Sequence, residues 1–417
     1  HHYCRLVRFF PPTQNVVETF EMSLLKTKGI PPSRRPNCEG WVRARIVEPL
    51  GMRSSYAVIT TETRARRPRS YVPFFDDMTY ERHGRLAPAG NLVFDNAAGS
   101  ITSTPGDMAL YLQMLLRKGQ GPEKRVVSEE SFGLFIHPYI AAKEFSPTAF
   151  YGYGIGVDKL DGRTILRHTG GMASFMSALM ADLDGGVGAF ASINAQLGYR
   201  PNPVAQFAIE TMYAKAQQKP VPSQPALPDP ATVKNAADYA NTYVSADGRQ
   251  VEVVADGERL SLRSAGRSIL LQSGDVDAFL AAEPPWHRFP IIFVRAERKG
   301  ATAGDKKLPV TELLYGTDWF TNQNYTGPKT VPSNPELKPF AGYYRADSGW
   351  VGTIRIVQRK GKLWSDGVTP LEPLGKALFR LGSEQFNPET VEFFYTVDGK
   401  AQMMKFNGQD LWRVNTA

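Results

Sequence analysis

The spacing of apolar and polar positions predicts helices mixed with strands in the first half of the chain. Residues 41–50 have the pattern of a short helix that Gly51 ends. At 103–107, a hydroxyl cap, a proline in the first turn and an acid three residues after the threonine indicate the start of a second helix, which Gly119 would end. The apolar face of this helix would consist of Met108, Leu112, Leu115 and Leu116. Residues 203–216 form a third candidate helix.

Strand patterns occupy the region between the second and third candidate helices. Residues 151–157 form a strand pattern interrupted by glycines, which is typical of a strand that another backbone or a ligand approaches closely. Residues 163–194 have the patterns of further strands, and Asp-Leu-Asp-Gly-Gly at 182–186 has the composition of a hairpin turn. We therefore expect strands joined by turns in this region.

A proline-rich stretch divides the chain. Five prolines lie within residues 219–230, and such a segment forms neither a helix nor a central strand, so we expect a semi-rigid extended spacer. A weaker boundary follows at 327–335. The expected parts are residues 1–40, which we leave unassigned, 41–216, the linker 217–235, 236–330 and 336–417.

After the linker, the pattern changes to that of an all-β protein. Short alternating runs such as 250–254 and 259–262 are separated by Asp-Gly turns. The segment Tyr-Ala-Asn-Thr-Tyr at 239–243 is echoed 101 residues later by Phe-Ala-Gly-Tyr-Tyr at 340–344. Two small antiparallel barrels are the expected outcome, because closing a sheet removes its edges. We expect barrel cores, rather than a barrel mouth, to hold Trp286, Trp319, Trp350, Trp364 and Trp412.

The composition is that of a globular protein without a membrane span. With 417 residues, of which 42% are apolar and 22% charged, two or three domains are expected. No apolar run reaches the length of about 18 residues that a transmembrane helix needs. The N-terminus lacks the layout of a signal peptide and does not begin with Met, so we expect a processed chain or a fragment. The cysteines are Cys4 and Cys38, and no Cys/His spacing suits a metal ion.

A run of four arginines within residues 64–69 contributes to the net charge of +8. This run has two interpretations, a patch that binds an anionic polymer or membrane, and a solvated loop of a basic protein. We favour the solvated loop and expect no nucleic-acid partner, because no interleaved aromatic residues or nucleic-acid motif accompany the run.

The candidate chemistry lies at His168-Thr169-Gly170-Gly171, between the apolar runs 164–166 and 175–180. A cationic or polar side chain followed by Thr-Gly resembles the Lys-Thr-Gly box of β-lactamases and penicillin-binding proteins, with His in place of Lys. Together with three other segments, this motif resembles the β-lactamase-related serine hydrolases, the family of D-amino-acid peptidases, esterases and class C β-lactamases. The four segments, in family order, are 41–52, 97–107, 151–154 and 168–171.

The resemblance implies an α+β fold. Residues 41–216 would form the C-terminal half of a catalytic domain, an antiparallel sheet with helices. The two β regions resemble the lipocalin-like domains that follow the catalytic domain in some members. His168, on an edge strand, would hold the substrate carboxylate or a shared proton, and Gly171 would supply an N–H to the oxyanion hole. Thr169 and Gly170 would shape the strand along which substrate lies. The alternative for His168 is a hydrogen-bonded turn histidine.

Tyr151 and Tyr153 are candidates to line the cleft, and strand packing is the other interpretation of both. The resemblance also requires Ser-x-x-Lys and Tyr-x-Asn motifs, because the nucleophilic serine needs a base. Ser23 and Lys26 form a Ser-x-x-Lys pattern, but it lies only 26 residues before Pro49 and no Tyr-x-Asn accompanies it. We therefore also expect a truncated or frame-shifted member that has lost its first half.

The implied function is that of a serine hydrolase that acts on a small peptide, amide or ester through an acyl-enzyme, without metal or cofactor. The alternative is a non-catalytic binding protein or an inactive remnant. By the resemblance alone, the expected location is the periplasm or the cell exterior. The sequence does not indicate an oligomeric state.

Overall fold

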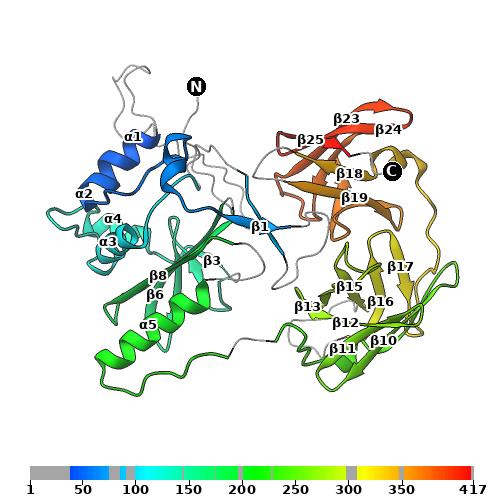
Figure 1. The fold of residues 1–417 in the computed structure, drawn as a ribbon, viewed down its shortest axis with the longest axis horizontal. Helices are drawn as coiled ribbons and strands as arrows, with labels where there is room; N and C mark the ends of the chain where they lie inside the picture. The colour runs from blue at the N-terminus through cyan, green and yellow to red at the C-terminus, as the bar shows by residue number, and fades with distance from the viewer. Residues whose placement is uncertain are drawn as a thin grey trace. The chain divides into compact units, whose positions relative to one another are not determined.

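The computed structural model describes residues 38–74, 85–90, 99–142, 145–172, 174–195, 201–226, 229–296, 308–346 and 352–414. These residues form two compact units, the first containing most described residues up to Ala226 and the second those from Asp229 onward. The first unit mixes helices with antiparallel strands, and the second consists almost wholly of strands (Figure 1). The predicted fold class is confirmed.

A six-stranded antiparallel sheet forms the centre of the first unit (Figure 1). Its strands follow one another in chain order, as the pattern of turns predicts. They are β3 (Ile140–Ala141), β4 (Phe150–Tyr151), β5 (Gly156–Leu160), β6 (Arg163–Met172), β7 (Phe175–Asp182) and β8 (Val187–Ile193). A separate two-stranded sheet pairs β1 (Tyr71–Pro73) with β2 (Leu86–Pro88).

Helices cover both faces of the sheet because successive strand residues point to opposite sides. Leu166 and Leu179 join a core with Leu115, whereas Ile165 packs with Ile209 on the other face. The helical segments are α1 (Cys38–Val42), the π-helix η3 (Arg43–Val47), α2 (Glu48–Leu50), the 3₁₀ turn η4 (Glu62–Arg66), α3 (Pro105–Leu116), α4 (Glu129–Phe135) and α5 (Asn202–Ala216).

The predicted start of the second helix is confirmed at α3. The Thr104 hydroxyl accepts a hydrogen bond from the backbone N–H of Asp107 at 3.2 Å. The Asp107 carboxylate is buried and accepts hydrogen bonds from the Ser54 N–H and the Ser55 hydroxyl, both at 2.7 Å. Two of the segments singled out in the sequence, near Gly51 and near Thr104, are thus joined.

Three sequence expectations require correction. Residues 151–157 do not form one strand, because the chain turns between β4 and β5. In this turn, Gly154 has a φ of +81° and the Gly152 N–H donates to the Ile155 carbonyl. The second helix ends at Leu116, before Gly119. β6 is an edge strand only in its C-terminal part, since it pairs with β5 over residues 163–167 and with β7 beyond them.

The second unit contains two barrels of the same up-and-down topology. The first is a nine-stranded sheet whose end strands β12 and β13 are separated only by Leu271, so the chain itself bridges the two ends. Its strands are β9 (Asn241–Ser245), β10 (Gln250–Asp256), β11 (Arg259–Ser264), β12 (Arg267–Leu270), β13 (Gln272–Ser273), β14 (Ala278–Leu280), β15 (Ile291–Arg295), β16 (Val310–Tyr315) and β17 (Asp318–Thr321).

The second barrel is closed by pairing of its first and last strands. Its strands are β18 (Gly342–Arg345), β19 (Thr353–Arg359), β20 (Lys362–Ser365), β21 (Thr369–Pro373), β22 (Leu378–Leu381), β23 (Thr390–Val397), β24 (Lys400–Phe406) and β25 (Gln409–Arg413). A 3₁₀ turn precedes each barrel, η5 (Ala236–Asp238) and η6 (Pro335–Phe340).

The internal repeat is visible in matching hydrogen bonds. The buried Tyr243 hydroxyl donates to the Tyr239 carbonyl and the buried Tyr344 hydroxyl to the Phe340 carbonyl, each at 2.9 Å. Trp286 lies in the first core as predicted, but Trp412 is 55% exposed and lies outside the second core, which corrects its assignment. Trp350 lies outside the described residues.

Candidate functional site

The C-terminal half of β6 extends past its neighbour β5. Pairing between these strands runs from Leu160 opposite Arg163 to Gly156 opposite Arg167. Residues 168–172 of β6 continue beyond this point and pair with β7 only. Within the described part of the chain, this stretch therefore has one side to which no strand is bonded.

The direction of the backbone groups along this stretch follows from the register. The Leu183 N–H donates to the Thr164 carbonyl at 2.9 Å, so Thr164 turns its backbone groups toward β7. Backbone direction alternates along a strand, and β6 pairs with β7 without a bulge. The N–H and C=O groups of Thr169 and Gly171 therefore face away from β7, on the open side.

A histidine and a tyrosine meet beside this open side. The Tyr151 hydroxyl on β4 and the His168 Nε2 atom on β6 are 2.7 Å apart. Phe145 stacks on Tyr151 with ring centroids 5.9 Å apart and lies 6.4 Å from the His168 ring. Gly156 makes room for this arrangement, because a Cβ atom there would lie 3.1 Å from the Phe145 ring.

The surroundings of His168 favour its neutral form. Loss of water around the ring lowers the pKa of His168, and a backbone hydrogen bond with Thr169 opposes this shift. A neutral imidazole has one nitrogen that accepts and one that donates a hydrogen bond, so it suits proton exchange with a phenol.

The neighbouring Arg167 is already neutralised. Its guanidinium lies 2.9 Å from the Asp158 carboxylate. Burial alone would raise the pKa of Asp158, but hydrogen bonds from the Lys159 N–H, Ser146 and Arg167 hold it below the ordinary value. His168 and Tyr151, rather than this ion pair, are thus the polar side chains available at the open side.

Comparison with protein families identifies this part of the chain. A family model described as Beta-lactamase matches residues 39–209. Residues 39–209 are thus similar to the beta-lactamase family over less than half of the chain. The match includes the sheet from β3 to β8, the start of α3 and the His168 motif.

Several solved structures are similar to the chain at low identity. A penicillin-binding protein homologue from Pyrococcus abyssi, described as octameric, is 21% identical, with a TM-score of 0.38 over 68% of this chain and 59% of that chain. A D-stereospecific amidohydrolase from Streptomyces sp. is 23% identical, with a TM-score of 0.30 over 37% and 43%. A D-amino acid amidase from Ochrobactrum anthropi SV3, complexed with L-phenylalanine amide, is 22% identical, with a TM-score of 0.29 over 42% and 47%.

The chain spans less than two thirds of the length of each of the three structures. No curated protein matches the sequence.

The structure places the predicted site residues of the beta-lactamase domain as follows. His168, Thr169, Gly170 and Gly171 lie on the open half of β6, and Tyr151 reaches them from β4. Tyr153 is 46% exposed and packs against Tyr139, with ring centroids 4.8 Å apart, away from the described contacts of His168. Ser23 and Lys26 lie outside the described residues.

Two glycines keep the surface of the open strand flat. A Cβ atom at Gly170 would lie 2.8 Å from the Ser177 hydroxyl, and one at Gly171 would lie 3.1 Å from the Met176 sulfur. Phe145 is the residue that sequence reasoning missed. It lies in a loop without a periodic pattern, so no local signal pointed to its stacking on Tyr151.

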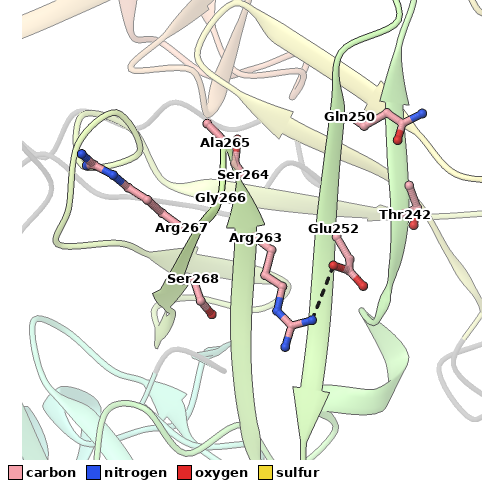
Figure 2. Close-up of a pocket in the computed structure, with 9 residues that line it drawn as sticks. All are labelled: Thr242, Gln250, Glu252, Arg263, Ser264, Ala265, Gly266, Arg267 and Ser268. Carbon is pink, nitrogen blue, oxygen red and sulfur yellow. Dashed lines mark ion pairs between the residues drawn. The ribbon is translucent and has the colours of Figure 1, made fainter.

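A separate surface depression lies on the first barrel. Figure 2 shows a depression on the first barrel whose lining is polar, with Glu252 paired to Arg263 at 3.6 Å. Among the described residues, no cluster of His, Cys, Asp or Glu is arranged to hold a metal ion. None of the described helices combines the length and the apolar character needed to cross a bilayer.

Proposed function

We propose that the beta-lactamase domain binds a small peptide, amide or ester along the open half of β6 and acts as a serine hydrolase through an acyl-enzyme. The observation that carries this proposal is the open backbone of Thr169 and Gly171 beside His168. An extended substrate pairs with such an edge as an added strand, and the fixed N–H of Gly171 stabilises the negative charge that develops on the substrate carbonyl oxygen.

The side chains near this edge supply proton transfer and orientation. His168 shares a proton with Tyr151 and exchanges it with the substrate, since its lowered pKa keeps a ring nitrogen unprotonated near neutral pH. Thr169 and Gly170 shape the strand, and Tyr151 lines the approach. Ser23 is our candidate nucleophile and Lys26 its candidate base.

Covalent labelling tests the catalytic part of the proposal. The purified chain is incubated with a fluorophosphonate probe and, separately, with benzylpenicillin, and adducts are located by intact mass and peptide mapping. We expect one adduct per chain, on Ser23, and none on a Ser23→Ala variant. Absence of an adduct on any serine would contradict catalysis by this chain.

Amide chemical shifts test the binding part separately. Titration with a short acylated peptide is expected to shift the amide signals of Thr169 and Gly171 more than those on the β7-facing side of β6. Shifts at these amides without an adduct would favour the alternative of a non-catalytic binding protein. Unchanged shifts at both amides would contradict substrate binding at β6.

We further propose an exported location and a division of labour along the chain. Residues 41–216 would carry the site, and the linker 217–235 would connect them to separate barrels at 236–330 and 336–417. Cell fractionation tests the location, and limited proteolysis tests whether cleavage concentrates in the linker.

A further inference from the structure

The arginine-rich run has a defined backbone. Thr60 and Thr63 exchange hydrogen bonds at the start of η4, with the Thr60 N–H donating to the Thr63 hydroxyl at 3.2 Å. The Arg67 N–H then donates to the Arg64 carbonyl at 3.2 Å. Farther along, the Asn194 side chain donates to the Arg69 carbonyl at 2.8 Å. The run is therefore held at both ends, and most of its side chains are exposed, as expected of a solvated loop.

The guanidinium of Arg67 lacks a counter-charge among the described residues. Arg67 is half-buried, and its Nε atom is buried without a hydrogen-bond partner. Burial and the positive charge of Arg64 both lower the pKa of Arg67. No described carboxylate lies within ion-pair distance of Arg64, Arg67 or Arg69, and the nearby Arg66 donates to the uncharged hydroxyl of Tyr56.

Other partly buried arginines of this chain have oxygen acceptors. Arg163 pairs with Asp182, and Arg167 pairs with Asp158. In the second unit, Arg295 pairs with Asp277, and Arg359 donates to backbone carbonyls. The Nε atoms of Arg167 and Arg359 are also buried without a partner, but the terminal nitrogens of these two residues have acceptors. Arg67 differs because no described oxygen accepts a hydrogen bond from its guanidinium, and a polar group buried without an acceptor is costly.

We propose that Arg64 and Arg67 form a binding site for a small anion with phosphate or carboxylate oxygens. Guanidinium groups match such oxygens in paired hydrogen bonds. A bound anion offsets the repulsion between the two arginines and gives the Arg67 Nε atom an acceptor. Arg64 is exposed, and its positive charge is close enough to act on Arg67. This site is independent of the proposed hydrolase activity.

Calorimetric titration with inorganic phosphate, and separately with citrate, tests the site at constant ionic strength. The variant is Arg64→Gln with Arg67→Gln. The matched control is Arg53→Gln with Arg117→Gln, which removes the same charge from two exposed arginines of the first unit. We expect saturable binding by the natural chain and the control, and binding weakened by about tenfold or more in the variant.

Two further measurements complete the test. Thermal melts establish that each variant is folded. The single Arg64→Gln variant is included because it changes only an exposed side chain and leaves the partly buried Arg67 in place. Co-sedimentation with phosphatidylcholine vesicles containing phosphatidylglycerol distinguishes a lipid headgroup from a soluble anion as the source. The site is supported if the Arg64→Gln, Arg67→Gln variant loses binding of the soluble anion or of the vesicles while the control variant keeps it. No binding of any probe, or equal loss in the control, overturns it.

Discussion

His168 makes the stability of the protein depend on pH in a defined direction. The pKa of His168 is lower in the folded chain than its ordinary value of 6.5. At a pH between these two pKa values, the unfolded chain therefore binds more protons than the folded chain. The contribution of His168 to the free energy of unfolding is therefore full above about pH 6.5 and declines as the pH falls toward the folded-state pKa.

This dependence is measured by urea unfolding of the natural chain and a His168→Gln variant between about pH 5 and 8. We expect the difference in unfolding free energy, natural chain minus variant, to become smaller on acidification. An NMR titration of the imidazole is expected to give a pKa below 6.5. A flat difference, or a pKa at or above that value, would contradict the desolvation of His168.

At the scale of elements, the start of α3 connects two distant parts of the first unit. The Asp107 carboxylate in the first turn of α3 accepts hydrogen bonds from Ser54 and Ser55, which follow α2. An Asp107→Ala variant leaves the Ser54 N–H and the Ser55 hydroxyl without this acceptor. We expect its unfolding free energy to fall by about 2 kcal/mol.

The measurement for Asp107 is chemical denaturation, with Thr104→Ala as the comparison. Loss of the Thr104 cap alone is expected to cost about 1 kcal/mol, because it removes one hydrogen bond from the helix end. If the two substitutions cost the same, the contacts of Asp107 with Ser54 and Ser55 do not stabilise the fold.

The strands show where prediction by element succeeds and where it fails. The turn at 182–186 and the helix start at Thr104 were predictable, because both depend on residues adjacent in the chain. The length of β5 was not, since the glycines at 151–157 fit either one strand or two. The open side of β6 exists because β5 begins only at Gly156. The residues of the candidate site were therefore predictable from the sequence, but the missing neighbour strand beside them was not.

At the scale of the whole molecule, the two barrels are connected by a buried arginine. Arg359 on β19 donates to the Gly316 carbonyl at 2.6 Å, in the turn between β16 and β17, and to the Gly367 carbonyl at 2.9 Å. Burial lowers the pKa of Arg359 to about 10, so it remains charged at neutral pH.

An Arg359→Ala variant is expected to lose about 3 kcal/mol of unfolding free energy in the second unit, because two buried carbonyls lose a charged donor. Differential scanning calorimetry of the full chain is expected to show that the barrel transition broadens or divides. The control is Lys362→Ala, which removes an exposed ion pair with Glu372 and is expected to change stability by less than about 1 kcal/mol. Equal effects of the two substitutions would contradict the role of Arg359.

The sequence by itself determined the features that depend on neighbouring residues or on repetition. These include the cap at Thr104, the Asp-Gly turns of the barrels, the mixed fold followed by two barrels, and the repeat that places Tyr243 and Tyr344 in equivalent bonds. Each follows from local backbone preferences or from apolar periodicity, which act on the chain in the same way wherever it folds.

The tertiary structure alone decided which distant groups meet. Tyr151 and His168 are brought within hydrogen-bond distance by the turn before β5, and Phe145 covers them from a loop. The fold also leaves the Nε atom of Arg67 buried without a hydrogen-bond partner, and it brings the Asn194 side chain to the Arg69 carbonyl. Strand register and loop packing select these partners, and both depend on the sum of many contacts that no short stretch of sequence encodes.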